Sequence, residues 1–238
     1  SVQEQQIRDC LESIGLTVEN VDILSLEEGN VRIEITQHGP YGLEECEKLV
    51  APLLSEVLGE RIEVRRQECR EEPGGLTVIP LETAKRYGVE TGFAGAAKGG
   101  GVLSGDSYSF LELANGQALV VLSDGMGNGQ RAAQESQATI YLLQELLKAG
   151  FDEKLALKTV NTILSLRSDE EVFATVDMAL IDLHTGRGSF LKVGSTPSFI
   201  KREDQLIPIS GGSLPLGVFR EIDVTSIEQQ LQPGDLLI

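Results

Sequence analysis

The sequence is short of basic residues: 20 Lys and Arg stand against 37 Asp and Glu in 238 residues, a net charge of −17 at pH 7. Proteins that bind the nucleic-acid backbone need clustered Lys and Arg, because binding releases the counterions of the phosphates. This sequence has no such cluster. We therefore exclude nucleic acid as a partner, and the surplus of acid most simply favours solubility.

Long apolar runs are also missing. No stretch approaches the ~20 residues that cross a bilayer, and the first residues lack the basic and apolar regions of a signal peptide. We expect a cytoplasmic location and no membrane contact by this chain itself, as in the cytosolic part of a membrane-anchored protein.

Cysteine and histidine are scarce. The three cysteines, Cys10, Cys46 and Cys69, are odd in number and lack metal-type spacing, which is typical of reduced thiols in a cytosolic protein. The two histidines, His38 and His184, stand in loop-like stretches without a nucleophile at a recognisable spacing. A hydrolytic triad therefore has no support.

The first third of the chain predicts a small α/β unit. Apolar residues at helical spacing predict helices over 7–14 and 43–57, and alternation predicts strands over 18–26, 31–35 and 61–69. The order helix, strand, strand, helix, strand resembles a ferredoxin-like split unit without its first strand.

A domain edge is predicted between residues 71 and 86. The run Glu71-Glu72-Pro73-Gly74-Gly75 combines charge, Pro and Gly, which interrupt regular structure. Residues 76–81 either pair with the first sheet or belong to the linker. We assign 1–86 to a small α/β domain with its linker and 87–238 to a second domain.

The second domain predicts an α+β fold, with strands, two helices and then strands again. Residues 107–113 and 117–122 predict a hairpin around Asn115-Gly116, a strong turn dipeptide. Helices are expected from Arg131 to Lys148 and from Glu153 to Leu166. Strands are predicted over 89–97, 173–183, 188–193, 198–201 and 223–229, and a last apolar run begins at 236–238.

Two aspartates adjoin glycine at the ends of the predicted hairpin strands. Asp106 follows Gly105, and Asp124 precedes Gly125 directly after the apolar run 119–122. Two carboxylates and the exposed carbonyl of Gly125 would make half of an oxygen-ligand site for Mg²⁺ or Mn²⁺. The alternative is that Gly-Asp and Asp-Gly are ordinary turn dipeptides.

Other candidates point to structural roles or to a different class. Asp177 is more typical of a hydrogen-bonded strand acid, and Asp235 of a turn or the start of a strand. The glycine-rich runs 98–101 and 125–129 match neither common phosphate-binding motif. The second run is similar to the nucleotide box of histidine-kinase-like ATPases, but the Asn-bearing helix that should precede it is missing.

Long motifs in the second domain resemble the sporulation branch of the metal-dependent PPM-type serine/threonine phosphatases. The resemblance extends from about residue 88 to the end of the sequence. The matching runs are Ala96-Ala97-Lys98-Gly99-Gly100-Gly101, Ser104-Gly105-Asp106-Ser107, Ser123-Asp124-Gly125-Met126-Gly127-Asn128-Gly129, 159–167, 192–202 and Leu214-Pro215-Leu216-Gly217. The resemblance implies a PPM-type β-sandwich with flanking helices, in partial form. It also implies that the first third, 1–86, is a small α/β regulatory domain, because the first third looks like the cytosolic regulatory segment that precedes the phosphatase in such proteins.

The resemblance also implies a two-metal site. In this family two divalent ions, usually Mn²⁺, hold the water that attacks phosphoserine, so no protein nucleophile is needed. By motif, Asp106 would bind one ion, Asp124 would bridge both, and Gly125 would offer its carbonyl. Gly105 stands where many relatives have a second acid. The family's remaining metal acids would follow the strand that begins at 236–238, so we expect a phosphatase domain lacking its C-terminal part and inactive alone.

The implied substrate is a phosphorylated anti-anti-sigma factor, whose dephosphorylation activates a compartment-specific sigma factor. The two helices of the second domain follow the metal loop, and we hypothesise that they form a regulatory switch that moves Gly125. The rival hypothesis is a catalytically incomplete module that forms a homodimer or contacts a cell-division protein. A third and weaker hypothesis is an ATPase of the histidine-kinase-like fold.

Overall fold

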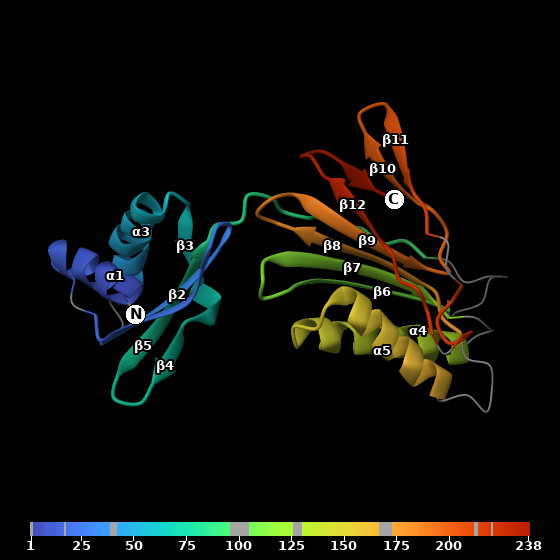
Figure 1. Ribbon diagram of the computed structural model, residues 1–238, viewed down its shortest axis with the longest axis horizontal. Coiled ribbons are helices and arrows are strands. Elements are labelled where there is room, and N and C mark those ends of the chain that lie inside the picture. Colours follow the sequence, from blue (N-terminus) through green and yellow to red (C-terminus); the bar gives the residue numbers. More distant parts are fainter. Residues whose placement is uncertain are drawn as a thin grey trace. The chain divides into compact units, whose positions relative to one another are not determined.

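The computed structural model describes residues 2–16, 18–38, 42–95, 105–125, 130–166, 173–211, 214–219 and 221–238 (Figure 1). The chain divides into two compact units, Ser1–Arg86 and Tyr87–Ile238. Each unit has a hydrophobic core of its own. In the described part of the chain, no helix combines the length and the apolar character needed to span a membrane.

The first unit packs helices on one antiparallel sheet. The sheet has the order β1-β2-β5-β3, with β4 also paired to β5. Its elements are α1 (Val2–Ser13), β1 (Asn20–Glu27), β2 (Asn30–His38), α2 (Gly42–Glu45), the π-helical turn η1 (Cys46–Val50), α3 (Ala51–Leu58), β3 (Ile62–Val64), the 3₁₀ turn η2 (Arg66–Glu68), β4 (Arg70–Glu72) and β5 (Leu76–Thr83).

The alternating pattern of β2 explains how this sheet meets its helices. Ile33 and Ile35 are fully buried, together with Leu11 of α1 and Leu54 of α3. Helix α3 is capped at its C-terminal end by Gly59, whose φ of +71° is a left-handed conformation that glycine adopts without strain. The expected alternation of 31–35 is confirmed, and the helical faces are confirmed in part, since Ile14 and Val57 are exposed.

One expectation for the first unit was wrong, and the structure decides between the two alternatives for another segment. Residues 61–69 do not form one strand, because β3 and β4 are separated by η2 and meet β5 in different registers. The interruption lies opposite Pro80, which has no N–H to continue the ladder. Of the two alternatives for residues 76–81, pairing with the first sheet is confirmed, because β5 is the strand that β2, β3 and β4 all contact. The ferredoxin-like order therefore misses two strands.

The second unit is built in three layers: helices, a five-stranded sheet and a smaller sheet (Figure 1). The large sheet has the order β12-β9-β8-β7-β6, and the small one has the order β11-β10-β13. The elements are β6 (Asp106–Glu112), β7 (Gln117–Asp124), α4 (Gln130–Lys148), α5 (Glu153–Leu166), β8 (Val176–Asp182), β9 (Arg187–Val193), β10 (Ser198–Arg202), β11 (Gln205–Ile209), β12 (Ser226–Gln230) and β13 (Leu236–Leu237).

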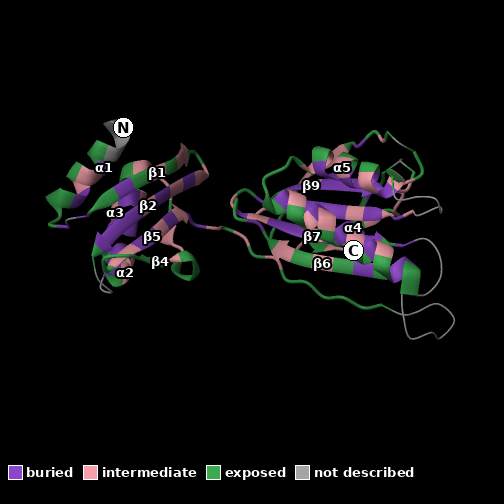
Figure 2. Cartoon of the chain, turned by 90° about the horizontal axis from the view of Figure 1, so that it is seen from below, coloured by how far each residue is buried: buried purple, intermediate pink, exposed green. Residues whose placement is uncertain are grey.

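Alternate residues of the central strands face different layers, and Figure 2 shows how much of these strands is buried. Leu119 and Val121 of β7 join Leu143 of α4 in the main core under the helices. On the opposite face, Ala179 and Phe190 pack with residues of the small sheet. Helix α5 begins where expected, because the Asp152 carboxylate accepts hydrogen bonds from the next backbone amides. The expected α+β fold is confirmed.

Two strand expectations for this unit need correction. Residues 89–95 form no strand; Phe93 instead stacks on Tyr108 with ring centroids 3.5 Å apart. Strand β11 was not expected at all. Its hairpin with β10 turns at Glu203, which adopts φ +52° without glycine, and Pro208 within β11 weakens the strand pattern. The predicted glycine loop 99–101 and residues 96–97 lie outside the described residues.

A candidate metal centre at the end of the β6–β7 hairpin

The register of the β6–β7 hairpin brings Asp106 and Asp124 together. The turn at Asn115-Gly116 is the expected one, and Gly116 has φ +78°. From this turn the strands pair residue by residue until Asp106 lies directly opposite Asp124. Directly opposed residues have Cβ atoms only ~5 Å apart. The hairpin therefore presents two carboxylates side by side at its open end.

The pairing of like charges affects protonation. Burial raises the pKa of Asp124 above its ordinary value, and the hydrogen bond and negative charge of the Asp106 carboxyl raise it further. A divalent cation would relieve this repulsion by binding both carboxylates. The electrostatics of the pair thus favour either a shared proton or a cation.

Gly105 leaves room for a third oxygen ligand. A Cβ atom on Gly105 would lie 3.1 Å from the carbonyl oxygen of Gly125 and 3.7 Å from Oδ1 of Asp124. These two oxygens therefore border the small space that a side chain at 105 would fill. Carboxylate and carbonyl oxygens are the ligands that Mg²⁺ and Mn²⁺ take, so the donor set fits such an ion. Within the described residues, no group of three or more His, Cys, Asp or Glu side chains forms a fuller site.

Gly125 is held against the first turn of α4. A Cβ on Gly125 would lie 1.9 Å from the carbonyl oxygen of Ala132, which real contacts do not allow. The Gly125 amide donates to the carbonyl oxygen of Gly105 at 3.2 Å. The position next to Asp124 therefore needs glycine because the helix backbone occupies the place of a side chain. The rest of the predicted metal loop, 126–129, lies outside the described residues.

Thr175 fixes the backbone of Asp124 from the neighbouring strand. Its amide donates to the Asp124 carbonyl at 2.9 Å, and its Oγ1 accepts from the Asp124 amide at 3.0 Å. Next to it, Ala174 bridges Gly125 on one side and Leu216 on the other. Reasoning from the sequence missed Thr175 and Ala174, because neither a Thr nor an Ala beside a strand carries a signal of its own.

Small polar side chains lie between α4 and the hairpin. The hydroxyls of Ser107 and Ser136 are 2.7 Å apart, and both side chains are buried. The hydroxyl of Ser123, also buried, has no hydrogen-bond partner among the described residues. Directly beneath the two carboxylates, the helix is therefore packed through small residues and not through large apolar ones.

The other aspartates considered have structural partners. Asp177 accepts hydrogen bonds from Lys192 and Ser198. Asp235 forms a two-point ion pair with Arg202. These contacts agree with the strand and turn roles expected for them.

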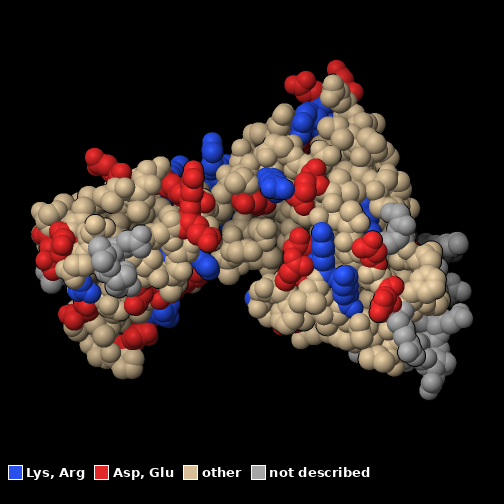
Figure 3. Space-filling model, viewed as in Figure 1, with Lys and Arg blue, Asp and Glu red and all other residues tan. Residues whose placement is uncertain are grey.

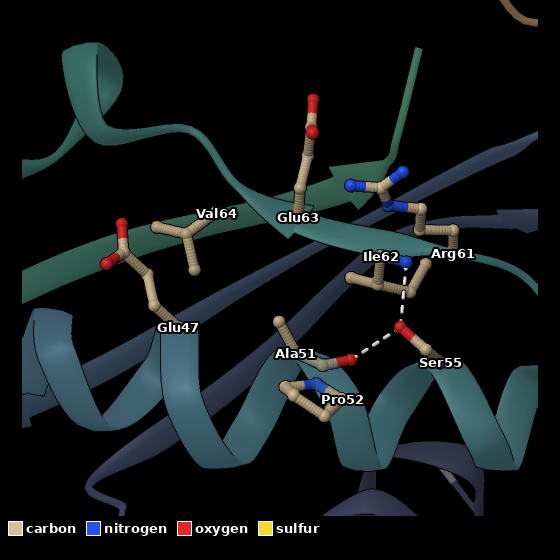
Figure 4. Close-up of a pocket in the computed structure, with 8 residues that line it drawn as sticks. All are labelled: Glu47, Ala51, Pro52, Ser55, Arg61, Ile62, Glu63 and Val64. Atoms are coloured by element: carbon tan, nitrogen blue, oxygen red, sulfur yellow. Dashed lines mark hydrogen bonds between the residues drawn. The ribbon is translucent and has the colours of Figure 1, made fainter. Parts of the chain in front are cut away.

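Charged side chains and one groove lie elsewhere on the surface. On the face in Figure 3, acidic side chains are spread over both units, and basic ones are interspersed among them. A groove of about 340 Å³ lies in the first unit between α3 and β3, with Pro52, Arg61 and Glu63 in its lining (Figure 4). Ser55 in its wall accepts a hydrogen bond from the Ile62 amide at 2.8 Å. The groove shares no residue with the carboxylate pair.

Comparison with solved structures identifies the class of protein. The structure of the PP2C phosphatase domain and a fragment of the regulatory domain of SpoIIE from Bacillus subtilis matches with a TM-score of 0.70 and 46% sequence identity. The match covers 99% of this chain and 69% of that chain. The helix–sheet–sheet unit is thus that of the PP2C-type, or PPM-type, serine/threonine phosphatases.

The family follows from the sequence comparisons. The family model "Stage II sporulation protein E (SpoIIE)" matches residues 114–238, and the model "SpoIIE, regulatory domain" matches residues 1–83. The chain belongs to the stage II sporulation protein E family, which confirms the resemblance seen in its motifs.

Two curated relatives are similar over the whole chain. Stage II sporulation protein E of Priestia megaterium is 47% identical over 238 residues, which are 100% of this chain and 41% of the relative. The protein of that name from Bacillus subtilis (strain 168) is 48% identical over 238 residues, again 100% of this chain and 28% of the relative. The chain therefore spans less than half of each relative.

Proposed function

We propose that the chain is part of a manganese-dependent protein serine phosphatase whose metal centre is built on Asp106, Asp124 and the carbonyl of Gly125. The observation that supports this most directly is the opposition of the two carboxylates at the end of β6 and β7. The PP2C-type fold supports a phosphatase reaction at that place.

The residues of this chain bind and orient. Asp106, Asp124 and the Gly125 carbonyl would hold the metal ions, with Asp124 contributing to both positions of the complete site. Thr175 holds the Asp124 backbone through two hydrogen bonds, which fixes the direction of its carboxylate. When bound, Mn²⁺ or Mg²⁺ lowers the pKa of water and neutralises charge on phosphoryl oxygens. Further acidic ligands are expected beyond β13.

The proposed substrate is a phosphoserine anti-anti-sigma factor, and its dephosphorylation activates a compartment-specific sigma factor. Membership of the sporulation family supports this part of the proposal. A cytoplasmic location accords with such a substrate.

A manganese titration tests the phosphatase proposal. The 238-residue chain and a version extended through the expected acids would be compared on a phosphoserine peptide, with Asp124→Asn as the inactive variant. Asp204→Asn, which removes an acid from the β10–β11 turn, is the matched control. We expect activity only in the extended form, lost in Asp124→Asn and kept in Asp204→Asn. Equal activity in the short form would refute an incomplete site.

A second candidate is a regulatory and dimerisation module without activity in this form. Two observations favour it: only two acids gather at the centre in the described residues, and residues 1–83 match a regulatory domain. Such a module would form a homodimer or contact a cell-division protein. Sedimentation of the chain with and without Mn²⁺ tests it, because a monomer at all concentrations excludes the homodimer.

Regulation of the centre would act through α4 and α5. Because the Gly125 Cα lies against the Ala132 backbone, a shift of α4 moves the Gly125 carbonyl and opens or closes a metal position. Ligand geometry is strict for small divalent ions. Gly125→Ala should displace α4 and abolish metal binding, whereas Gly92→Ala, in open space, should not. If Gly125 keeps one conformation whether or not a partner binds the helices, the switch is refuted.

A further inference from the structure

Asn161 of α5 is a buried polar side chain far along the sequence from the carboxylate pair. Its residue is 1% exposed, although it lies among the apolar residues Leu157, Val160 and Leu164 that attach α5 to the core. A buried amide is costly unless its donors and acceptor are satisfied. The partners of Asn161 therefore indicate what it does.

Two of its hydrogen bonds go to one short backbone segment. The Asn161 Nδ2 donates to the carbonyl oxygen of Phe219 at 2.9 Å, and its Oδ1 accepts from the amide of Gly217 at 2.9 Å. Gly217 has φ +90°, a conformation that side chains rarely adopt. One amide group thus fixes both ends of the turn 217–219 on the surface of α5.

This turn continues directly into the segment that supports the metal centre. Leu216 donates to the carbonyl oxygen of Ala174 at 2.8 Å, and Ala174 donates back to Leu216 at 3.2 Å. On its other side Ala174 bridges Gly125. The next residue, Thr175, makes the two hydrogen bonds to the Asp124 backbone. A line of hydrogen bonds and peptide bonds therefore leads from Asn161 to Asp124, and it passes beside Gly125 at Ala174.

The middle of this line, at Pro215 and Leu216, is tightly packed. A Cβ on Gly194, at the end of β9, would lie 2.7 Å from backbone atoms of Pro215. Leu216 itself is fully buried in the main core. This packing blocks movement of Pro215 toward β9, and the turn beyond Leu216 restrains the segment from moving the other way.

We propose that Asn161 is a positioning residue for the metal centre, which holds Asp124 and Gly125 in place through Leu216, Ala174 and Thr175. The proposal rests on the proposed metal function of those two residues. It adds a route from α5 to the centre that is separate from the direct contact of α4 with Gly125. Loss of the amide frees the turn 217–219 and lets the bridging residues shift, which misplaces both metal ligands.

The test compares Asn161→Ala with Leu157→Ala. Leu157 is buried on the same helix and touches the core, so its loss weakens the fold without removing the amide. Titration of Mn²⁺ into the extended protein, followed by electron spin resonance, measures metal affinity. We expect about a 10-fold loss of affinity in Asn161→Ala, the usual effect of removing a supporting partner, and less than about a 2-fold change in Leu157→Ala. Equal changes in the two variants would overturn the proposal.

Hydrogen exchange of the 238-residue chain without metal gives a second readout. The Thr175 and Gly125 amides donate to Asp124 and Gly105, and both should exchange at least about 10-fold faster in Asn161→Ala than in Leu157→Ala when scaled to the β8 amides. Unchanged exchange at both amides would overturn the positioning role. If the unmutated extended protein binds no Mn²⁺, the metal function fails, while the exchange result still decides whether Asn161 positions the segment.

Discussion

Asp106 lies directly opposite Asp124 in the antiparallel pairing of β6 with β7. Cross-strand neighbours of like charge destabilise a hairpin, and here they stand at its end, next to a backbone carbonyl and two glycines. A hairpin that keeps this arrangement at a cost in stability is typical of a site built for a cation. The cost can be measured.

Replacing Asp106 with Asn should slightly stabilise the metal-free protein and weaken metal binding. The pKa of Asp124 is raised by burial and by the Asp106 carboxyl. A raised carboxylate pKa means that the folded state loses stability as pH rises through that value. Asn at position 106 removes the negative charge that helps to raise the pKa of Asp124. We expect the unfolding free energy to rise by about 0.5 kcal/mol at pH 7. The gain is small because solvent screens exposed charges.

Thermal unfolding with and without Mn²⁺ measures both effects. The unmutated protein should unfold at a higher temperature when Mn²⁺ is added, because a ligand of the folded state stabilises it. Asp106→Asn should lose most of this response, and Asp204→Asn should keep it. An Asp106→Asn protein that Mn²⁺ stabilises as strongly as the original would contradict a ligand role for Asp106.

Filling the space at Gly105 should impair the centre with little loss of stability. An Ala side chain there would lie 3.1 Å from the Gly125 carbonyl oxygen and 3.2 Å from the Ala132 Cβ, so both neighbours must move by a few tenths of an ångström. We expect about a 10-fold loss of Mn²⁺ affinity and a loss of about 1 kcal/mol in unfolding free energy.

Gly88→Ala is the matched control for this substitution, because a Cβ there meets nothing within 4 Å. Isothermal titration with Mn²⁺ and urea unfolding give the two quantities. An affinity unchanged in Gly105→Ala would show that the Gly125 carbonyl is not a ligand or that the space beside it is not used.

The hairpin and its carboxylate pair were predictable from the sequence because local signals define them. Asn115-Gly116 fixes the turn, and the residue-by-residue pairing from Glu112 and Ala118 onward brings Asp106 to Asp124. Helix α5 was predictable for the same reason. Its cap, Asp152, accepts hydrogen bonds from the amides of Lys154 and Leu155, which are only two and three residues away.

Contacts between distant segments were not predictable. Thr175 meets Asp124 across 51 positions, and Asn161 meets Gly217 across 56, so no local pattern marks either residue. Strand β11 was missed because its turn uses Glu203 in a left-handed conformation, where sequence rules expect glycine. Contacts between distant segments therefore limit what the sequence predicts, whereas the two aspartates of the site are marked by their immediate neighbours.

Removing the charge of Lys192 should be strongly destabilising. Its side chain is 1% exposed, pairs with Asp177, and donates to Ser198 Oγ at 2.7 Å. Lys192→Met leaves the Asp177 carboxylate partly buried without its cation, and we expect a loss of about 3–5 kcal/mol. Urea unfolding measures it, provided that the denaturant slope stays constant.

The double variant Lys192→Met with Asp177→Leu provides the control for that experiment. If the cost comes from an uncompensated charge, removal of both partners should recover much of the loss. A double variant that is less stable than Lys192→Met alone would instead assign the cost to packing around β9.

The pair Arg202 and Asp235 should govern stability in acid. Arg202 donates to the two carboxylate oxygens at 2.8 and 2.6 Å, and the Gln232 amide donates to Oδ2 at 2.8 Å. The hydrogen bond from Arg202 holds the pKa of Asp235 below its ordinary value. Such a group stabilises the fold above its unfolded pKa, about 3.9 for Asp, and this contribution is lost as pH falls through the lower folded value.

The difference in unfolding free energy between the original chain and Asp235→Asn should therefore be constant near neutral pH and shrink below about pH 4. Urea unfolding from pH 7 to 2.5 measures it, and Asp204→Asn, an acid without these partners, should show no such narrowing. A gap that stays constant into strong acid would mean that Asp235 acts through the shape of its turn. In that case the link between the strand β10 and the turn before β13 would not depend on charge.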